Sequence, residues 1–211
     1  MKIAILGAAG NLGSRIAAEA LRRRHHVTPL TAADVDATDP AAVAALLAGH
    51  DVGVAATRPP PGREHQATAV TRALLAAHAE AGVRFIMVGG SGSLLVPGAD
   101  GRLVADDQRW VPAQIHDLAH TAVDQLELCR QDTHTDWTYI TPSALMEPGL
   151  RTGHYRTGTD ELLIEPDGRS YISMEDMAVA ILDEIEAPTH RRQRFTVAST
   201  PESGSPGSDH P

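Results

Sequence analysis

The sequence predicts an α/β fold in which a doubly wound, mainly parallel sheet carries helices on both faces. Apolar segments alternate with segments of helical spacing from Met1 to Val88, which is the pattern of strand–helix–strand units. The first apolar run, at residues 1–6, stops at Gly7, as expected of a parallel strand that is buried on both faces. The 211 residues are enough to bury a large core as a single domain.

Four strands and three helices are predicted in the first half of the chain. We expect strands at residues 1–6, 27–31, 51–57 and 83–88, and helices at residues 11–24, at residues 40–48 and from the proline-rich loop 59–62 to Gly82. Asp39 is the expected N-cap of the second helix, because its carboxylate can accept hydrogen bonds from free N–H groups and Pro40 suits the first helical position. Helical spacing predicts that Val70, Leu74, Leu75 and His78 face the core.

The second half is less regular and is expected to form a small C-terminal, substrate-side subregion. A loop at 89–112 leads to a helix at 117–131, a strand at 136–141 and a hairpin at 162–172 that turns at 166–168. Ser173 is the expected cap of a last helix, with Asp176 in the capping-box position, and 195–198 is the last strand. Residues 1–198 form the predicted domain, and residues 199–211, rich in Ser, Pro and Gly, form a predicted disordered tail.

Composition excludes several classes of function. The chain has 18 basic and 27 acidic residues, a formal net charge of −9 and no long basic cluster, which argues against nucleic-acid binding. Aromatic residues make up 3% of the chain, too few for a base-stacking platform. Cys129 is the only cysteine, so a disulfide framework is excluded. Without a membrane-spanning apolar run or a signal peptide, we expect a cytoplasmic protein.

A glycine-rich turn lies between the first predicted strand and the first predicted helix. Gly7 permits a tight turn, Gly10 allows backbone amides to approach a pyrophosphate, and Gly13 allows close packing of helix and strand. The helix N-terminus adds unpaired donors and partial positive charge. The phosphate-binding residues expected here are Gly7, Ala9, Gly10, Asn11, Leu12 and Gly13. The alternative is a glycine turn that only connects two elements.

The spacing Gly-x-x-Gly-x-x-Gly resembles that of the short-chain dehydrogenase/reductase superfamily. The chain is similar to its atypical NAD(P)H-binding branch, which includes NADH-flavin-reductase-like proteins, NmrA-like proteins and biliverdin reductase B. The other motifs that carry this resemblance are residues 88–94, 136–139, 142–144, 147–149, 151–156, 173–176 and 192–197. The resemblance implies a Rossmann-like fold and NADP or NAD as the cofactor.

The resemblance also implies the course of the cofactor along the sheet. Cofactor contacts are expected from Thr31, Asp36 and Arg58 at the adenosine end, and from Ala55, Ala56, Thr57, Thr141, Pro142 and Ser143 on the nicotinamide side. For Arg58 the alternative is a solvated loop arginine. Ser91 and Ser93 follow the strand at 83–88 and are catalytic candidates, although for Ser91 a turn-forming role is equally well supported.

One departure from the family pattern is structural. Only residues 32–35 separate the second strand from Asp36, which resembles the acidic residue that follows a third strand. A crossover between parallel neighbours needs about a dozen residues. The usual second crossover helix therefore cannot be present, and we expect a missing or unpaired third strand, an open adenosine end and no clear choice between NAD and NADP.

A second departure concerns catalysis. The main branch of the superfamily uses a Tyr-x-x-x-Lys dyad, but Lys2 is the only lysine in this chain. Hydride transfer to a flavin can proceed with a proton from solvent, whereas alcohol–ketone chemistry and sugar epimerisation are disfavoured. His116 is a further candidate acid. His116, His120 and Asp124, spaced one helical turn apart, could also form a metal site, but a chance histidine pair is the preferred interpretation, and no metal is expected.

The leading hypothesis is an NAD(P)H-dependent reductase of a flat conjugated acceptor, such as a flavin or a quinone. The predicted substrate pocket contains Leu94, Met146, Arg151, His154 and Tyr155. The alternatives are a non-redox isomerase, cyclase or dehydratase, and a non-catalytic NAD(P)-sensing protein. The expected partner is a small-molecule substrate, with no nucleic acid and no membrane, and a homodimer is plausible for this fold.

Overall fold

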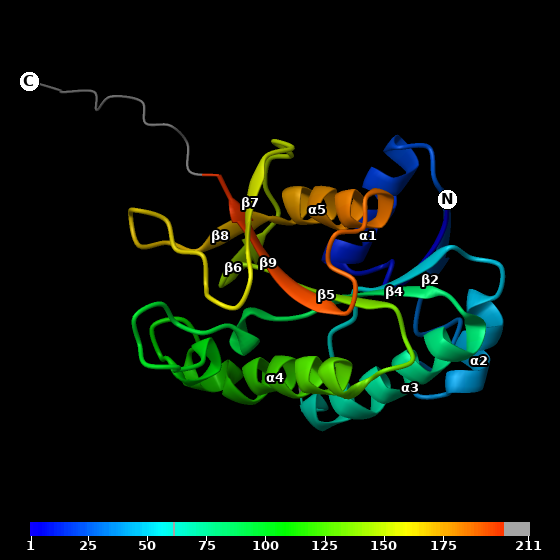
Figure 1. Ribbon diagram of the computed structural model, residues 1–211, viewed down its shortest axis with the longest axis horizontal. Coiled ribbons are helices and arrows are strands. Elements are labelled where there is room, and N and C mark those ends of the chain that lie inside the picture. The colour runs from blue at the N-terminus through cyan, green and yellow to red at the C-terminus, as the bar shows by residue number, and fades with distance from the viewer. Residues whose placement is uncertain (61, 201–211) are drawn as a thin grey trace, which may run out of the picture.

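The computed structural model describes residues 1–60 and 62–200, which form three layers with a central sheet (Figure 1). The strands are β1 (Lys2–Leu6), β2 (His26–Leu30), β3 (Val52–Ala55), β4 (Arg84–Val88), β5 (Trp137–Thr141), β6 (Leu145–Glu147), β7 (Tyr155–Gly158), β8 (Tyr171–Ser173) and β9 (Gln193–Ser199). The α-helices are α1 (Asn11–Arg22), α2 (Pro40–Leu47), α3 (Ala67–Ala81), α4 (His116–Gln131) and α5 (Met174–Glu186). Short 3-10 turns are η1 (Glu64–Gln66), η2 (Ser91–Ser93), η3 (Val104–Asp106) and η4 (Ala113–Ile115).

The main sheet has the strand order β2-β1-β3-β4-β5-β9-β7. Its neighbouring strands are parallel except for β7, which runs antiparallel to β9. A second, two-stranded parallel sheet pairs β6 with β8. The chain leaves β1 toward β2 on one side and returns to β3 on the other side, so the winding changes direction between β1 and β3. The doubly wound, Rossmann-like prediction is therefore confirmed.

Two apolar clusters hold the layers together, because successive side chains of a strand point to opposite faces of the sheet. On one face, Ile3 and Ile5 of β1 pack with the cluster that includes α1 and α5. On the other face, Ala4 and Leu6 pack with residues of α2, α3 and α4. Figure 1 shows α1 and α5 together on one side of the sheet and α2, α3 and α4 on the other.

The short connection after β2 is as expected from the sequence. In the described part of the chain, β2 is one of the two edge strands of the main sheet, and α2 is the only helix between it and β3. The segment after β2 forms two local turns, in which Asp34 accepts hydrogen bonds from Thr31 and Asp36 accepts them from Thr38. Asp36 therefore lies in a turn beyond the edge strand, and the third strand of the family pattern is absent there.

Helix ends follow the sequence signals closely, with one difference. The Asp39 carboxylate caps α2 by accepting from the N–H groups of Ala41 and Ala42, both at 3.1 Å. The Ser173 hydroxyl caps α5 through the Asp176 N–H at 3.0 Å. The expected capping box is wrong in its second half, because the Asp176 carboxylate accepts instead from the Thr152 hydroxyl and the Gly153 N–H.

The hairpin predicted at residues 162–172 is wrong, although its turn is present. Gly168 donates a hydrogen bond to Glu165 across the turn, but the flanking segments pair elsewhere. Leu162 donates to Leu95, and β8 pairs in parallel with β6, because these partners come from distant parts of the chain. The predicted start of the tail is one residue early, since Ser199 belongs to β9. Residues 201–211 of that tail lie outside the described residues.

No helix in the described part of the chain is long and apolar enough to cross a lipid bilayer.

Candidate cofactor and substrate site

A large cavity of about 1070 Å³ lies at the carboxyl ends of the parallel strands. It is lined by the residues that follow β1, β2, β3, β4 and β5, and by side chains of α3 and α4. Open α/β sheets bind ligands outside the carboxyl ends of their strands, where the winding changes direction. The cavity has this position, because its lining includes the residues that follow β1 and β3, the two strands between which the winding changes direction.

The glycine-rich turn enters the cavity at its centre. Gly7 has φ +87°, a left-handed conformation that favours glycine, and a Cβ there would lie 2.5 Å from the Ala56 carbonyl oxygen. Gly10 is the N-cap of α1 and has no side chain to cap it. Among the described residues, the N–H groups of Asn11 and Leu12 have no hydrogen-bond acceptor. Both residues line the cavity, so these free donors can hold an anionic pyrophosphate.

The charged side chains of the cavity lie in the segments that follow β2 and β3. Asp36 follows β2 together with Thr31 and Thr38, whereas Arg58 and Arg63 lie in the loop that follows β3. Hydrogen bonds from Thr38 hold the pKa of the exposed Asp36 carboxyl below its usual value. In contrast, neither arginine side chain forms an ion pair or a hydrogen bond within the described chain. The loop after β3 therefore offers two guanidinium groups to a phosphate.

The part of the lining that comes from residues after β4, here called the β4–β5 end, consists of uncharged groups. Its polar side chains are those of Ser91, Thr121, Gln125 and Ser143. Its apolar wall is formed by Trp110, Val111, Ile115, Leu118, Met146 and Met174. Among the described lining residues, the ionisable ones are Asp36, Arg58 and Arg63, all in the segments that follow β2 and β3. The β4–β5 end thus suits a flat apolar ligand and contributes no ionisable side chain to the cavity.

Thirteen of the predicted site residues line this cavity: Gly7, Gly10, Asn11, Leu12, Thr31, Asp36, Ala56, Thr57, Arg58, Ser91, Pro142, Ser143 and Met146. Others are adjacent in sequence but point away from it or are covered: Ala9, Gly13, Ala55, Thr141, Ser93 and Leu94. The Ser143 hydroxyl is already used, because it donates to the Val197 carbonyl at 3.0 Å.

Two residues at the end of η2, Ser93 and Leu94, are placed differently from the prediction. Ser93 is 5% exposed, and its hydroxyl donates to the Gly90 carbonyl, so it supports the turn and is no catalytic candidate. Leu94 is fully buried in a third apolar cluster, with Val104 and Leu162, which explains why it does not reach the cavity. Ser91 alone of the two serines lines the cavity, with no hydrogen bond from its hydroxyl among the described residues.

The predicted substrate residues at 151–155 lie outside the lining of the large cavity. Arg151 forms a bidentate ion pair with the Glu19 carboxylate of α1, with N–O distances of 2.9 and 3.0 Å. The Tyr155 hydroxyl donates to Asp183 of α5 at 2.8 Å. His154, between them, is exposed and lies outside the cavity lining. Buried Glu19 thus attracts this segment onto the α1–α5 side of the sheet, away from the cavity.

None of the three tyrosines lines the cavity. Tyr139 lies closest to it, but it is fully buried, and its hydroxyl donates to the Ala122 carbonyl at 2.9 Å. Burial raises the pKa of Tyr139 above its ordinary value. Its ring fills the space under Gly89, where a Cβ would lie 2.1 Å from the ring. This tyrosine is therefore a packing residue and cannot donate a proton to a ligand in the cavity.

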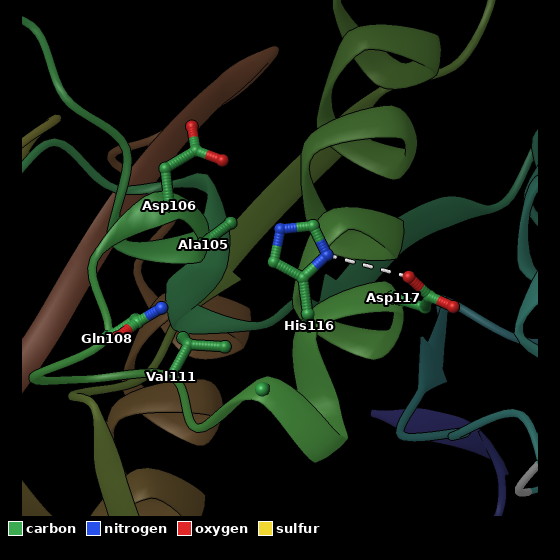
Figure 2. A pocket seen from close by; sticks show the side chains of 7 residues that line it. Ala105, Asp106, Gln108, Val111, His116 and Asp117 are labelled. Atoms are coloured by element: carbon green, nitrogen blue, oxygen red, sulfur yellow. Dashed lines mark ion pairs between the residues drawn. The ribbon is translucent and has the colours of Figure 1, made fainter.

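His116 is also separate from the large cavity. It borders a second cavity of about 340 Å³, with Asp106, Gln108 and Val111 (Figure 2). Its Nδ1 atom lies 3.5 Å from the Asp117 carboxylate. The face of α4 that meets the large cavity is the one that carries Ala119 and Ala122. His116 is therefore not placed to act as the acid for a ligand there.

Several lining residues were not predicted from the sequence. They are Val35, Thr38, Arg63, Gln66, Trp110, Leu118, Thr121 and Gln125. The polar ones on α4, Thr121 and Gln125, share a helix with buried apolar residues, which is the signal that would have pointed to them. Trp110 lies in the loop 89–112, where periodicity gives no information about burial.

The chain is similar to known proteins over most of its length. The family described as NAD(P)H-binding matches residues 7–188. YwnB of Bacillus subtilis, an uncharacterized protein, is 36% identical over 214 residues, with 96% of this chain and 100% of YwnB covered.

Two solved structures have closely similar folds. One is a proposed epimerase from Bacteroides thetaiotaomicron, with a TM-score of 0.85, 32% identity and coverage of 94% of this chain and 96% of that one. The other is SP1627 of Streptococcus pneumoniae, a proposed NADH-flavin reductase, with a TM-score of 0.84, 25% identity and coverage of 95% of this chain and 100% of that one.

Proposed function

Because the chain belongs to the NAD(P)H-binding family, we propose that it is an NAD(P)H-dependent oxidoreductase that transfers hydride to a flat conjugated acceptor. A flavin or a quinone is the class of acceptor that fits. The observation that carries the proposal is the division of the cavity lining into charged segments after β2 and β3 and an uncharged β4–β5 end, with free backbone donors in the turn after β1. A dinucleotide has the same division, with a phosphate-rich adenosine half and a neutral nicotinamide.

The chain's own residues would bind and orient the cofactor. The N–H groups of Asn11 and Leu12 would hold the pyrophosphate, and Arg58 and Arg63 would face the adenosine half. Thr57 and Ser91 would face the ribose and nicotinamide. A reduced nicotinamide supplies a hydride when it is bound, and the acceptor takes a proton from water.

The wall at the β4–β5 end would position the acceptor. Trp110 offers an aromatic surface for stacking, and Met146 offers a polarizable side chain that adapts to a flat ring. The apolar side chains would also exclude water from the space between the two rings. Positioning of this kind can supply a large part of the rate enhancement without a protein acid.

The same observation weighs against a non-redox enzyme. Isomerases and dehydratases remove a proton from carbon, which requires a positioned base. Among the described lining residues, the β4–β5 end has none. The absence of an acid or a base there is also what a non-catalytic NAD(P)-sensing protein would show, so this is the second candidate function.

Steady-state oxidation of NADPH and of NADH, followed at the absorbance band of the reduced nicotinamide, tests the proposal. FMN, riboflavin and a soluble quinone serve as acceptors, with calorimetric titration of each dinucleotide in parallel. We expect binding of at least one dinucleotide and turnover above the protein-free background with at least one acceptor. Binding without turnover for every acceptor would favour the sensor, and no binding at millimolar concentration would refute both.

A further inference from the structure

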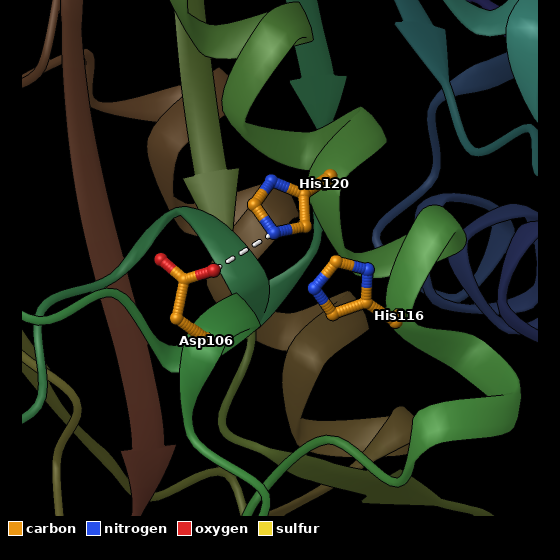
Figure 3. Close-up of side chains that lie close together, drawn as sticks. All are labelled: Asp106, His116 and His120. Carbon is orange, nitrogen blue, oxygen red and sulfur yellow. Dashed lines mark hydrogen bonds and ion pairs between the residues drawn. The ribbon is translucent and has the colours of Figure 1, made fainter.

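Three potential metal ligands lie together outside the cofactor cavity. They are a carboxylate oxygen of Asp106 and one ring nitrogen each of His116 and His120, and all lie within 4.8 Å of one another (Figure 3). The His120 Nε2 atom is 3.0 Å from Asp106 Oδ1. The two imidazole rings have centroids 4.5 Å apart. None of the three residues lines the large cavity, so the cluster is distinct from the proposed cofactor site.

Two rigid elements hold these side chains. His116 and His120 are four residues apart on α4, which places them on one face of the helix, one turn apart. Asp106 ends the η3 turn, whose first two residues, Val104 and Ala105, are buried. The backbone positions of the three ligands are thus fixed by packing, whereas their side chains are partly exposed and can rotate.

We propose that Asp106, His116 and His120 form a binding site for a divalent transition-metal ion such as Zn²⁺. Two imidazoles and one carboxylate are a ligand set that zinc and its first-row neighbours accept, whereas Mg²⁺ and Ca²⁺ prefer oxygen ligands alone. Ligand atoms around tetrahedral zinc lie about 3.4 Å apart, given metal–ligand bonds of ~2.0–2.1 Å. Asp106 and His120 already meet this spacing, and a rotation of the half-exposed His116 side chain brings in the third ligand.

The surroundings fit a site with an open coordination position. The second cavity, of about 340 Å³, borders Asp106 and His116 and leaves space beside them for water or a small anion. The Nδ1 atom of His116 faces Asp117, and its other ring nitrogen lies on the side of Asp106 (Figure 2). A carboxylate beside the non-ligating nitrogen orients a histidine ligand.

Such an ion would join η3 to α4. The loop that contains η3 also contains Trp110 and Val111, which line the large cavity. Metal binding would therefore restrain one wall of the cofactor site without contacting its ligand. This inference does not depend on the proposed function, because the ligands and the test are independent of NAD(P)H.

Calorimetric titration of the chelator-treated protein with Zn²⁺ tests the site, and titration with Co²⁺ reports its coordination through visible absorption. The ligand variants are Asp106→Asn, His116→Ala and His120→Ala. The matched controls are Asp124→Asn, which removes the next carboxylate along α4, and His134→Ala, which removes an exposed histidine elsewhere. Circular dichroism and the unfolding midpoint without metal verify that each variant is folded.

We expect one Zn²⁺ equivalent per chain and a loss of affinity of at least about tenfold in each ligand variant, because loss of even a hydrogen-bond partner of a metal ligand typically costs about 10–100-fold. The control variants should stay within about twofold of the parent protein. Co²⁺ should give the intense visible bands of a four- or five-coordinate ion in the parent protein only. Equal Zn²⁺ affinity in the parent protein and all three ligand variants would overturn the proposal, as would an absence of binding in the parent protein.

Discussion

A Cβ atom at Gly13 would lie 2.1 Å from the carbonyl oxygen of Gly7. The first turn of α1 therefore packs directly on the turn that leaves β1, with no room for a side chain between them. Gly10, in the middle of the same turn, is different, because its Cβ would lie 3.2 Å from that oxygen and its φ is −75°. Gly7 and Gly13 thus determine the shape of the turn, whereas Gly10 leaves space in the cavity.

Gly13→Ala should therefore destabilise the fold, and Gly10→Ala should not. We expect the free energy of unfolding to fall by about 1–3 kcal/mol in Gly13→Ala, the usual cost of overpacking, and by less than ~1 kcal/mol in Gly10→Ala. Urea denaturation followed by circular dichroism measures both. Equal unfolding midpoints for the two variants would contradict this account of the turn.

Arg58→Ala should weaken NADPH binding more than NADH binding. The Arg58 side chain has no ion-pair partner in the described chain, and it lines the large cavity in the loop after β3. Loss of a charge-assisted contact to a 2′-phosphate corresponds to about a tenfold weaker affinity for NADPH. Calorimetry with both dinucleotides measures the difference, and Arg72→Ala, an exposed arginine on α3, is the control. An equal loss of affinity for both dinucleotides would show that Arg58 does not contact the 2′-phosphate.

Ser91→Ala and Ser93→Ala form a matched pair in one short turn. Ser91 lines the uncharged end of the cavity, whereas the Ser93 hydroxyl is occupied by the Gly90 carbonyl. If the Ser91 hydroxyl orients the nicotinamide, its removal should lower kcat about tenfold or more through loss of positioning, and Ser93→Ala should leave kcat unchanged. Steady-state kinetics at saturating cofactor measures kcat for both variants. If only Ser93→Ala lowered kcat, the Ser91 hydroxyl would not be the group that orients the nicotinamide.

The stability of the fold should depend on pH through His78. This residue of α3 is 1% exposed, its Nδ1 lies 2.7 Å from the Leu74 carbonyl oxygen, and its ring stacks on Phe85. Burial lowers the pKa of His78 from 6.5 to about 4. The unfolded chain therefore takes up a proton below about pH 6.5, which the folded protein resists until about pH 4.

The free energy of unfolding should thus fall as the pH falls from 6.5 to 4, by up to about 3 kcal/mol from this residue. His78→Leu removes the titrating group, so its stability should decline less than that of the parent protein over this interval. Urea denaturation at pH 7 and at pH 4.5 measures the two slopes. Parallel slopes would show that His78 is not held neutral by the fold.

The strand–helix alternation could be predicted because it is local. Strands and helix ends are predicted by signals of only a few neighbouring residues. Examples are an apolar run, a capping residue such as Asp39 and a helix-ending glycine such as Gly82. The missing third strand was predictable for the same reason, since the distance from Thr31 to Asp36 is a count of residues. The glycine turn identified the centre of the site because strand, turn and helix follow one another directly.

The far wall of the site could not be predicted, because it depends on contacts between distant segments. Arg151 was expected at the substrate, but Glu19, 132 positions earlier, holds it on the other face. His116 was a candidate acid, but the face of α4 that lines the cavity is the one with Ala119 and Ala122. A helical spacing shows which residues share a face, and it does not show what that face meets.

Titration of the parent protein, Gly10→Ala and Gly10→Glu with NADPH and NADH tests the central claim most directly. Gly10 lies in the cavity at the start of α1, so a carboxylate there would repel a pyrophosphate while the backbone stays relaxed. The account predicts binding to the parent protein and an affinity at least about tenfold lower in Gly10→Glu, with the unfolding midpoint of that variant preserved. Equal affinity in the parent protein and Gly10→Glu, or no binding to the parent protein at millimolar dinucleotide, would contradict it.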